Sequence, residues 1–216
     1  SVSFDLSGLP PGEHDLSVVA WDDAGAAVTN RYAFELRPIP AGYGAGLAVS
    51  YYRLSRAPSA MPDFGALAPV ATGVVDTVSY PSTASAWEGA PTNLVDRFGA
   101  VFEGALWIQE TDVYRLSLSS DDGSRLFVDG NLVAEHARRA TVEKTVELPL
   151  ARGVHPLRIE YFENSGGAGL SVRWARGVDA PGAVPSTALL HRSGEVDGDG
   201  DGMPDWWEER YGLDAL

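Results

Sequence analysis

The chain has 216 residues, a formal net charge of −14 and 44% hydrophobic residues. That hydrophobic content suffices for a real core and excludes a disordered tail, and the length fits one large β-domain with appendages. The acidic balance argues against nucleic acid or an anionic membrane surface as a partner, because phosphate contacts need clustered Lys and Arg. The chain has no cysteine, which excludes disulfides, thiol catalysis and thiolate metal sites. The fold must then be stabilised by packing or by a hard metal ion bound by oxygen ligands, and calcium is such an ion.

The sequence contains no apolar run long enough to span a bilayer, and its N-terminus lacks the charged and apolar regions of a signal peptide. We therefore expect an excerpt from a longer protein, flanked by neighbouring domains and not inserted in a membrane.

Residues 1–38 alternate apolar and polar side chains in three runs, which predicts three strands at Ser1–Leu6, Glu13–Trp21 and Asn30–Leu36. The segment resembles the closing strands of bacterial immunoglobulin-like or cadherin-like surface repeats. Three strands are too few to close a sandwich, so this resemblance implies a partial neighbouring domain. The pair Asp22-Asp23 reads as a solvated hairpin turn in preference to a metal site.

Residues 39–46 are rich in Pro and Gly and are predicted to be a linker, followed by a β-rich body over 47–178 and a second linker over 179–196. Helical periodicity is absent from the body. Asp129-Gly-Asn131 predicts a two-residue hairpin turn, because these residues tolerate the positive φ that the turn requires. So many strands predict an all-β fold, an antiparallel sandwich or barrel closed against edge pairing. The predicted strands are Leu47–Leu54, Val70–Tyr80, Phe98–Gln109, Val113–Ser119, Arg125–Val128, Leu132–His136, Thr141–Leu150, His155–Phe162 and Leu170–Ala175.

An acidic pair, Asp121 and Asp122, joins two of these strand-like runs at the tip of their connecting loop. Adjacent carboxylates repel each other unless a cation lies between them, so the pair is a candidate calcium site. The alternative is an ordinary Asp-Asp-Gly turn between strands. Adjacent aspartates do not suit glycosidase catalysis, in which the two carboxylates are spaced apart on separate strands.

Three segments resemble the protective-antigen-type domain family, often called PA-fourteen, over roughly residues 45–178: GLAVSYYRL, DRFGAVFEGALWIQETDVYRLSLSSDDGSRLFVDGNLV and HPLRIEYFENSGGAGLSVRW. In the lectin members, which include yeast flocculins and bacterial adhesins, two successive aspartates joined by a cis peptide bind a calcium ion that binds sugar hydroxyls. The resemblance implies these roles for Asp121 and Asp122. It further implies a side-chain oxygen from Asn164 and backbone carbonyls from Gly166 and Ala168.

If the register of that second loop is shifted by one residue, Glu163 replaces Asn164 as the side-chain ligand. Other members of the family serve inside toxins or glycosidases and have no demonstrated sugar site. Tyr80, Trp87 and His136 could line a sugar platform or could be core and rim packing.

The C-terminal segment matches the spacing of a calcium-binding loop. Aspartates occupy positions 1, 3, 5 and 9, a backbone carbonyl is expected at 7, and a bidentate glutamate closes the loop at 12. These residues are Asp197, Asp199, Asp201, Asp205, Met203 and Glu208. A short helix is expected to follow, and a solvated acidic linker is the alternative. Because no helix is predicted before the loop, the segment resembles the thrombospondin type 3 and bacterial surface repeats more than a paired EF-hand. This resemblance implies that calcium would stiffen the segment structurally and would not serve signalling.

The sequence contains no GxSxG, HExxH or phosphate-loop motif, so we expect no enzyme. We expect a calcium-dependent carbohydrate-binding module of an extracellular or surface-anchored bacterial adhesin. The alternative is a structural spacer or accessory module of the same fold, in a surface protein or secreted glycosidase, with calcium serving only rigidity.

Overall fold

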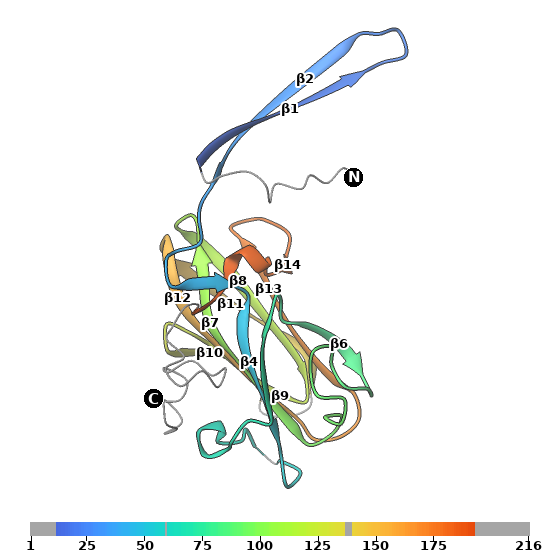
Figure 1. The fold of residues 1–216 in the computed structure, drawn as a ribbon, viewed down its shortest axis with the longest axis vertical. Coiled ribbons are helices and arrows are strands. Elements are labelled where there is room, and N and C mark those ends of the chain that lie inside the picture. The colour runs from blue at the N-terminus through green and yellow to red at the C-terminus, as the bar shows by residue number, and fades with distance from the viewer. Residues whose placement is uncertain (1–11, 59, 137–139, 193–216) are drawn as a thin grey trace. The chain divides into compact units, whose positions relative to one another are not determined.

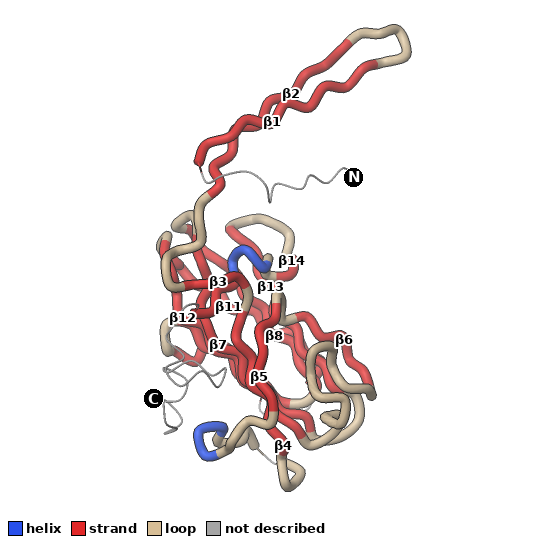
Figure 2. Tube along the Cα trace, viewed as in Figure 1, coloured by secondary structure: helices blue, strands red, loops and turns tan. Residues whose placement is uncertain are grey.

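The computed structural model describes residues 12–58, 60–136 and 140–192 (Figures 1 and 2). The chain divides into two compact units between Ala41 and Gly42. Within the described residues the structure is antiparallel β throughout, with two single turns of 3-10 helix, so the predicted all-β class is confirmed. In this part of the chain no helix is long and apolar enough to cross a membrane.

The first unit is a hairpin of β1 (Gly12–Trp21) and β2 (Ala27–Leu36), paired antiparallel in register from Gly12↔Leu36 to Trp21↔Ala27. Asp22 forms the turn, since its Oδ1 accepts hydrogen bonds from Ala24 N and Ala26 N at 2.9 and 2.8 Å. The solvated turn predicted for Asp22-Asp23 is confirmed. The predicted strand Ser1–Leu6 lies outside the described residues.

The second unit contains two sheets, and neighbouring strands in both run antiparallel. The larger sheet has the order β10-β9-β12-β7-β15-β3, and β4 joins it by pairing with both β7 and β5. Its strands are β3 (Tyr43–Ala45), β4 (Leu47–Arg53), β5 (Ala71–Val75), β7 (Phe98–Ile108), β9 (Gly123–Val128), β10 (Asn131–His136), β12 (Gly153–Glu163) and β15 (Leu189–Arg192).

The smaller sheet has the order β11-β8-β13-β14, and β6 pairs with β13. Its strands are β6 (Ser79–Thr83), β8 (Asp112–Asp121), β11 (Ala140–Leu150), β13 (Ala168–Arg176) and β14 (Gly182–Ala183). The two 3-10 turns are η1 (Phe64–Ala66) and η2 (Ser186–Ala188).

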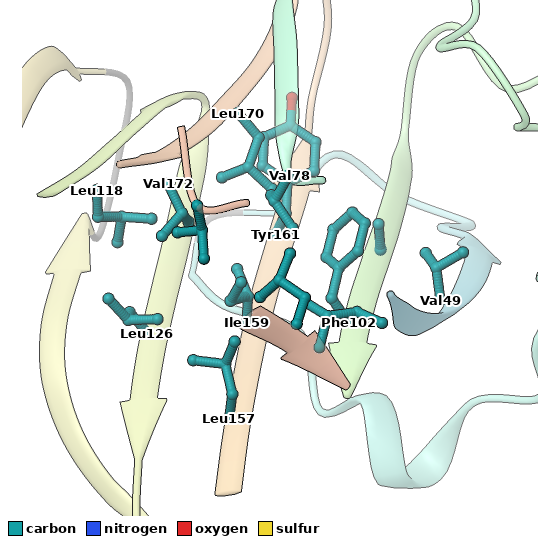
Figure 3. Close-up of a cluster of buried hydrophobic side chains, with 14 of the residues drawn as sticks. Val49, Val78, Phe102, Leu118, Leu126, Leu157, Ile159, Tyr161, Leu170 and Val172 are labelled. Atoms are coloured by element: carbon teal, nitrogen blue, oxygen red, sulfur yellow. The ribbon is translucent and has the colours of Figure 1, made fainter. Parts of the chain in front are cut away.

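The core lies between the two sheets, because alternate residues of each strand point inward. Figure 3 shows Phe102 and Ile159 of the larger sheet and Leu118 and Val172 of the smaller one within one buried cluster. All four side chains are buried, with at most 3% of their surface exposed. Burying one such side chain contributes about 1.5–3 kcal/mol, so this interface is what holds the sandwich together.

An aromatic cluster closes one part of this core. Trp87 stacks on Tyr80 with ring centroids 4.2 Å apart and contacts Tyr161 at 4.6 Å and Phe98 at 5.3 Å. Trp87 is itself buried, and so is His136, whose Nε2 lies 3.0 Å from Leu118 O. Of the three residues considered for a sugar platform, Trp87 and His136 are therefore core residues.

The predicted hairpin turn at Asp129 and Gly130 is confirmed, with φ values of 51° and 76° and with Val128 paired to Asn131. Two other expectations were wrong. The single strand Val70–Tyr80 is two strands, because β5 pairs with β4 in the larger sheet and β6 with β13 in the smaller.

The linkers predicted over 39–46 and 179–196 contain β3, β14 and β15, and β15 bridges β7 and β3 within the larger sheet. Short strands surrounded by Gly and Pro carry no alternating pattern, so the sequence could not distinguish them from connecting chain.

Candidate functional site

Asp121 and Asp122 lie where the chain passes from one sheet to the other. β8, which ends at Asp121, belongs to the smaller sheet, whereas β9, which begins at Gly123, belongs to the larger. The expectation of a loop tip was therefore wrong: the pair is a corner of the sandwich, and Asp122 is only 2% exposed. The peptide bond between the two aspartates is cis.

Hydrogen bonds fix this corner. Ser120 Oγ donates to Asp122 O at 2.8 Å and lies 2.7 Å from Ser124 Oγ. The Tyr161 hydroxyl donates to Asp121 O from the neighbouring β12. Because both carbonyls are held, the backbone of the two aspartates is fixed by the packed sheets and not left in a mobile loop.

The turn between β12 and β13 closes over the acidic pair. Asn164 N donates to Asp122 Oδ2 at 2.9 Å, although the two residues are 42 positions apart. A Cβ added at Gly167 would lie 2.6 Å from Ser82 Oγ and 3.9 Å from Asp121 Oδ2, so this turn passes close to Asp121 as well. The structure thus brings Asp121, Asp122 and the turn that carries Asn164 and Gly166 together.

Ala168 occupies a different environment. It is the first residue of β13 and is fully buried, and its carbonyl oxygen accepts a hydrogen bond from Trp87 Nε1 at 3.1 Å. Its carbonyl oxygen is therefore already a hydrogen-bond acceptor inside the aromatic cluster.

Glu163 adds a third carboxylate beside the pair. It is fully buried, its Oε2 lies 3.0 Å from the Tyr161 hydroxyl, and its Oε1 has no hydrogen-bond partner. Burial, followed by the nearby charge of Asp122, raises the pKa of Glu163 from 4.5 to about 7, and Asp121 and Asp96 act in the same direction.

The Tyr161 hydroxyl lies within hydrogen-bond distance of two acceptors, Asp121 O and Glu163 Oε2. Its hydrogen bond to the Glu163 carboxylate lowers the pKa of Glu163, against the larger effects of burial and of the Asp122 charge. Burial likewise raises the pKa of Tyr161, followed by the charge of Glu163. The charge of Asp122 raises the pKa of both of these buried groups in addition to the effect of burial.

A fourth carboxylate, from Asp96, approaches the turn from the segment that precedes β7. Asp96 Oδ1 accepts from Gly166 N at 3.1 Å, and Arg97 N donates to Asn164 O at 3.2 Å. The sequence analysis did not identify Asp96. An exposed Asp just before a strand has no local feature that separates it from a solvated surface residue.

The carboxylates that converge on this corner present oxygen atoms, which are the ligand type that hard cations prefer. Among the described residues, however, no three acidic or histidine side chains form a metal-binding group by themselves. A cation here would need the amide oxygen of Asn164 and backbone carbonyls in addition to the two aspartates, which is the donor set that the turn provides.

The other predicted metal ligands, Asp197, Asp199, Asp201, Met203, Asp205 and Glu208, lie outside the described residues. The C-terminal calcium loop therefore stays a prediction.

Comparison with known proteins agrees with this architecture. The family model of the PA14 domain matches residues 61–181, which is more than half of the chain. A search of curated proteins found no match.

Three solved structures illustrate the similarity in fold. A "PA14 sugar-binding domain from RTX adhesin" is 21% identical, with a TM-score of 0.59, over 68% of this chain and 98% of that one. The A domain of epithelial adhesin 9 from Candida glabrata, in complex with Galb1-4GlcNAc, is 12% identical with a TM-score of 0.59, over 72% of this chain and 93% of that one. An anti-sigma factor domain-containing protein is 21% identical with a TM-score of 0.56, over 70% of this chain, but the match spans only 49% of its own length.

The two-sheet antiparallel sandwich with an acidic corner defines the class of the second unit. With the family model matching most of that unit, the chain belongs to the PA14 domain family.

Proposed function

We propose that this chain is a calcium-dependent carbohydrate-binding module of an extracellular or surface-anchored adhesin. Asp121 and Asp122 would supply carboxylate oxygens, Asn164 its amide oxygen, and Gly166 and Ala168 backbone carbonyls. Calcium takes six to eight oxygen ligands, so this set leaves coordination positions for the hydroxyls of a sugar. When bound, the cation would supply the charge that polarises and orients those hydroxyls.

One observation carries the proposal. Two segments far apart in the sequence, the Asp121-Asp122 corner and the Asn164–Gly167 turn, meet through the hydrogen bond from Asn164 N to Asp122 Oδ2. Neither segment is a complete cation site alone. Their meeting supports a site in which carboxylate, amide and carbonyl oxygens would act together, held by the ends of sheet strands.

The buried charge around the corner supports a cation further. Glu163 Oε1 is a buried oxygen without a hydrogen-bond partner, and such an atom costs about 1–3 kcal/mol unless something compensates it. A divalent ion bound at this corner would offset both this cost and the repulsion among the acidic groups. The side chains of the chain itself therefore fit the cation that the family resemblance implies.

Two of the structures similar in fold support a carbohydrate as the ligand class, since one is described as a sugar-binding domain and another holds Galb1-4GlcNAc. The alternative is a structural module of the same fold. It is favoured by the burial of Trp87 and His136, which removes two of the three aromatic candidates from the surface.

A glycan array probed with the chain in millimolar calcium, in EGTA and in magnesium tests the proposal. We expect binding to a limited set of glycans in calcium only, because magnesium demands a small octahedron and releases water reluctantly. Binding unaffected by EGTA would refute calcium dependence. If calorimetry shows that the chain binds calcium and the array shows that it binds no glycan, the alternative of a structural module is supported instead.

A further inference from the structure

The Asn164–Gly167 turn is held from two sides. On one side its Asn164 N–H donates to Asp122, which we propose as a cation ligand. On the other side Asp96 accepts from Gly166 N at 3.1 Å and the Arg97 N–H donates to Asn164 O at 3.2 Å. The segment before β7 therefore contacts the turn with two hydrogen bonds, of which the one between Asp96 and Gly166 spans 70 positions of sequence.

This segment is itself well fixed. Arg97 has a φ of 51°, in the left-handed region that non-glycine residues seldom adopt. Its carbonyl accepts a hydrogen bond from Leu54 N at 2.8 Å, and the next residue, Phe98, begins the buried strand β7. The backbone of Arg97 is thus anchored to Leu54, just after β4, and to the start of β7. It can therefore hold Asp96 at a constant place, although the Asp96 side chain is exposed.

The bond from Gly166 is the contact on which the shape of the turn depends. Gly166 has a φ of 111°, which favours glycine, and a Cβ there would meet nothing within 4 Å. The turn therefore has little packing to fix it at this residue. A hydrogen bond to a charged acceptor is about twice as strong as a neutral one, so the Asp96 carboxylate restrains the peptide at Gly166.

We infer that Asp96 is a positioning residue, which holds the Gly166 peptide so that the turn has its ligand geometry before a cation arrives. The inference rests on the proposed calcium site. Asp96 would act through the turn and would not itself need to touch the ion. A turn ordered in advance binds more tightly, because the ordering cost is removed from the binding step.

The test compares three variants. Asp96→Ala removes the acceptor, and Asp96→Asn keeps an acceptor while removing the charge. The matched control is Asp63→Ala, because Asp63 Oδ1 accepts from Gly65 N at the same distance, 3.1 Å, at an exposed turn remote in sequence from the site. Calcium affinity is measured by isothermal calorimetry, and exchange of the Gly166 amide by NMR in EGTA.

We expect Asp96→Ala to weaken calcium binding roughly tenfold, the effect of about one net hydrogen bond. Asp96→Asn should bind calcium with an affinity within about threefold of the unmodified chain. Asp63→Ala should change neither the calcium affinity nor the exchange of the Gly166 amide. The Gly166 amide should exchange faster in Asp96→Ala only. Since the exchange measurement is made without calcium, it reports the hydrogen bond independently of the ion.

Unchanged calcium affinity in Asp96→Ala would overturn the inference. So would unchanged exchange of the Gly166 amide in Asp96→Ala, because the hydrogen bond to Asp96 would then not restrain the turn. A wild-type chain that binds no calcium would refute the proposed function itself, whereas the two preceding outcomes leave that function standing.

Discussion

The chain contains two Asp-Asp pairs, and their environments differ in every respect that matters for binding. Asp22 and Asp23 are exposed at the tip of the β1–β2 hairpin, where Asp22 caps the turn by accepting from two backbone amides. Asp122 is buried at the corner between two sheets, with Glu163 and the Asn164–Gly167 turn beside it. The same dipeptide therefore forms a turn in one place and a candidate cation site in the other, and the tertiary surroundings decide which.

The largest difference between the pairs should appear on removing one charge from each. Asp122→Asn keeps shape and hydrogen-bonding capacity but removes charge that calcium needs, so we expect calcium affinity to fall by about 100-fold or more and glycan binding to vanish. Asp23→Asn, the matched control at an exposed pair, should change neither. Calorimetry measures both affinities, and circular dichroism checks that the sandwich stays folded. Sugar binding that survives Asp122→Asn would show that recognition belongs elsewhere.

The buried corner should also make stability depend on pH. The pKa of Glu163 is raised in the folded chain from 4.5 to about 7, so between these values the folded state binds more protons than the unfolded state. Its contribution is present in full below pH 4.5 and is lost as pH rises through about 7, a decline of roughly 3 kcal/mol in calcium-free buffer. Urea unfolding from pH 4.5 to 8 measures it.

Glu163→Gln is the control for this decline, because glutamine stays neutral over the whole range. In EGTA, we expect the unfolding free energy of Glu163→Gln to fall much less with rising pH than that of the unmodified chain. Millimolar calcium should also reduce the slope in the unmodified chain, since a nearby cation favours the ionised carboxylate. An unfolding free energy that rises with pH in EGTA would contradict this assignment.

A smaller effect separates the glycines that follow the two pairs. A Cβ at Gly123 would lie 2.3 Å from Phe162 Cε1 and 3.1 Å from His136 O, so Gly123→Ala should destabilise the sandwich by about 1–3 kcal/mol through overpacking. Gly25 has nothing within 4 Å of the same position and a φ of 82°. Gly25→Ala should therefore strain only the hairpin turn and leave the urea midpoint of the sandwich unchanged.

The sequence predicted most strands of the sandwich because their alternation is local, as in Phe98–Ile108 and Gly153–Glu163. It also indicated Asp121, Asp122 and Asn164, but only the resemblance to a family joined them, since 42 positions separate Asn164 from Asp122. The change of sheet after Asp121 and the contact between Asp96 and Gly166 depend on pairing between distant strands. No local pattern encodes such contacts, which is why both were missed.

The smallest expected effect on sugar binding concerns the predicted C-terminal loop. Glu208→Gln should weaken calcium at a loop formed by Asp197 and its neighbours, and should leave sugar affinity nearly unchanged, provided that the loop and the corner share no ligands. Calorimetry with calcium should then show one site lost in Glu208→Gln and the other lost in Asp122→Asn. Ligands that bind only the folded state stabilise it by about 2.7 kcal/mol at a hundredfold excess over Kd, so each variant should also lose part of the rise in Tm that calcium gives. Loss of sugar binding in Glu208→Gln with the sandwich intact would mean that the C-terminal loop, and not the buried acidic corner, is the site of recognition.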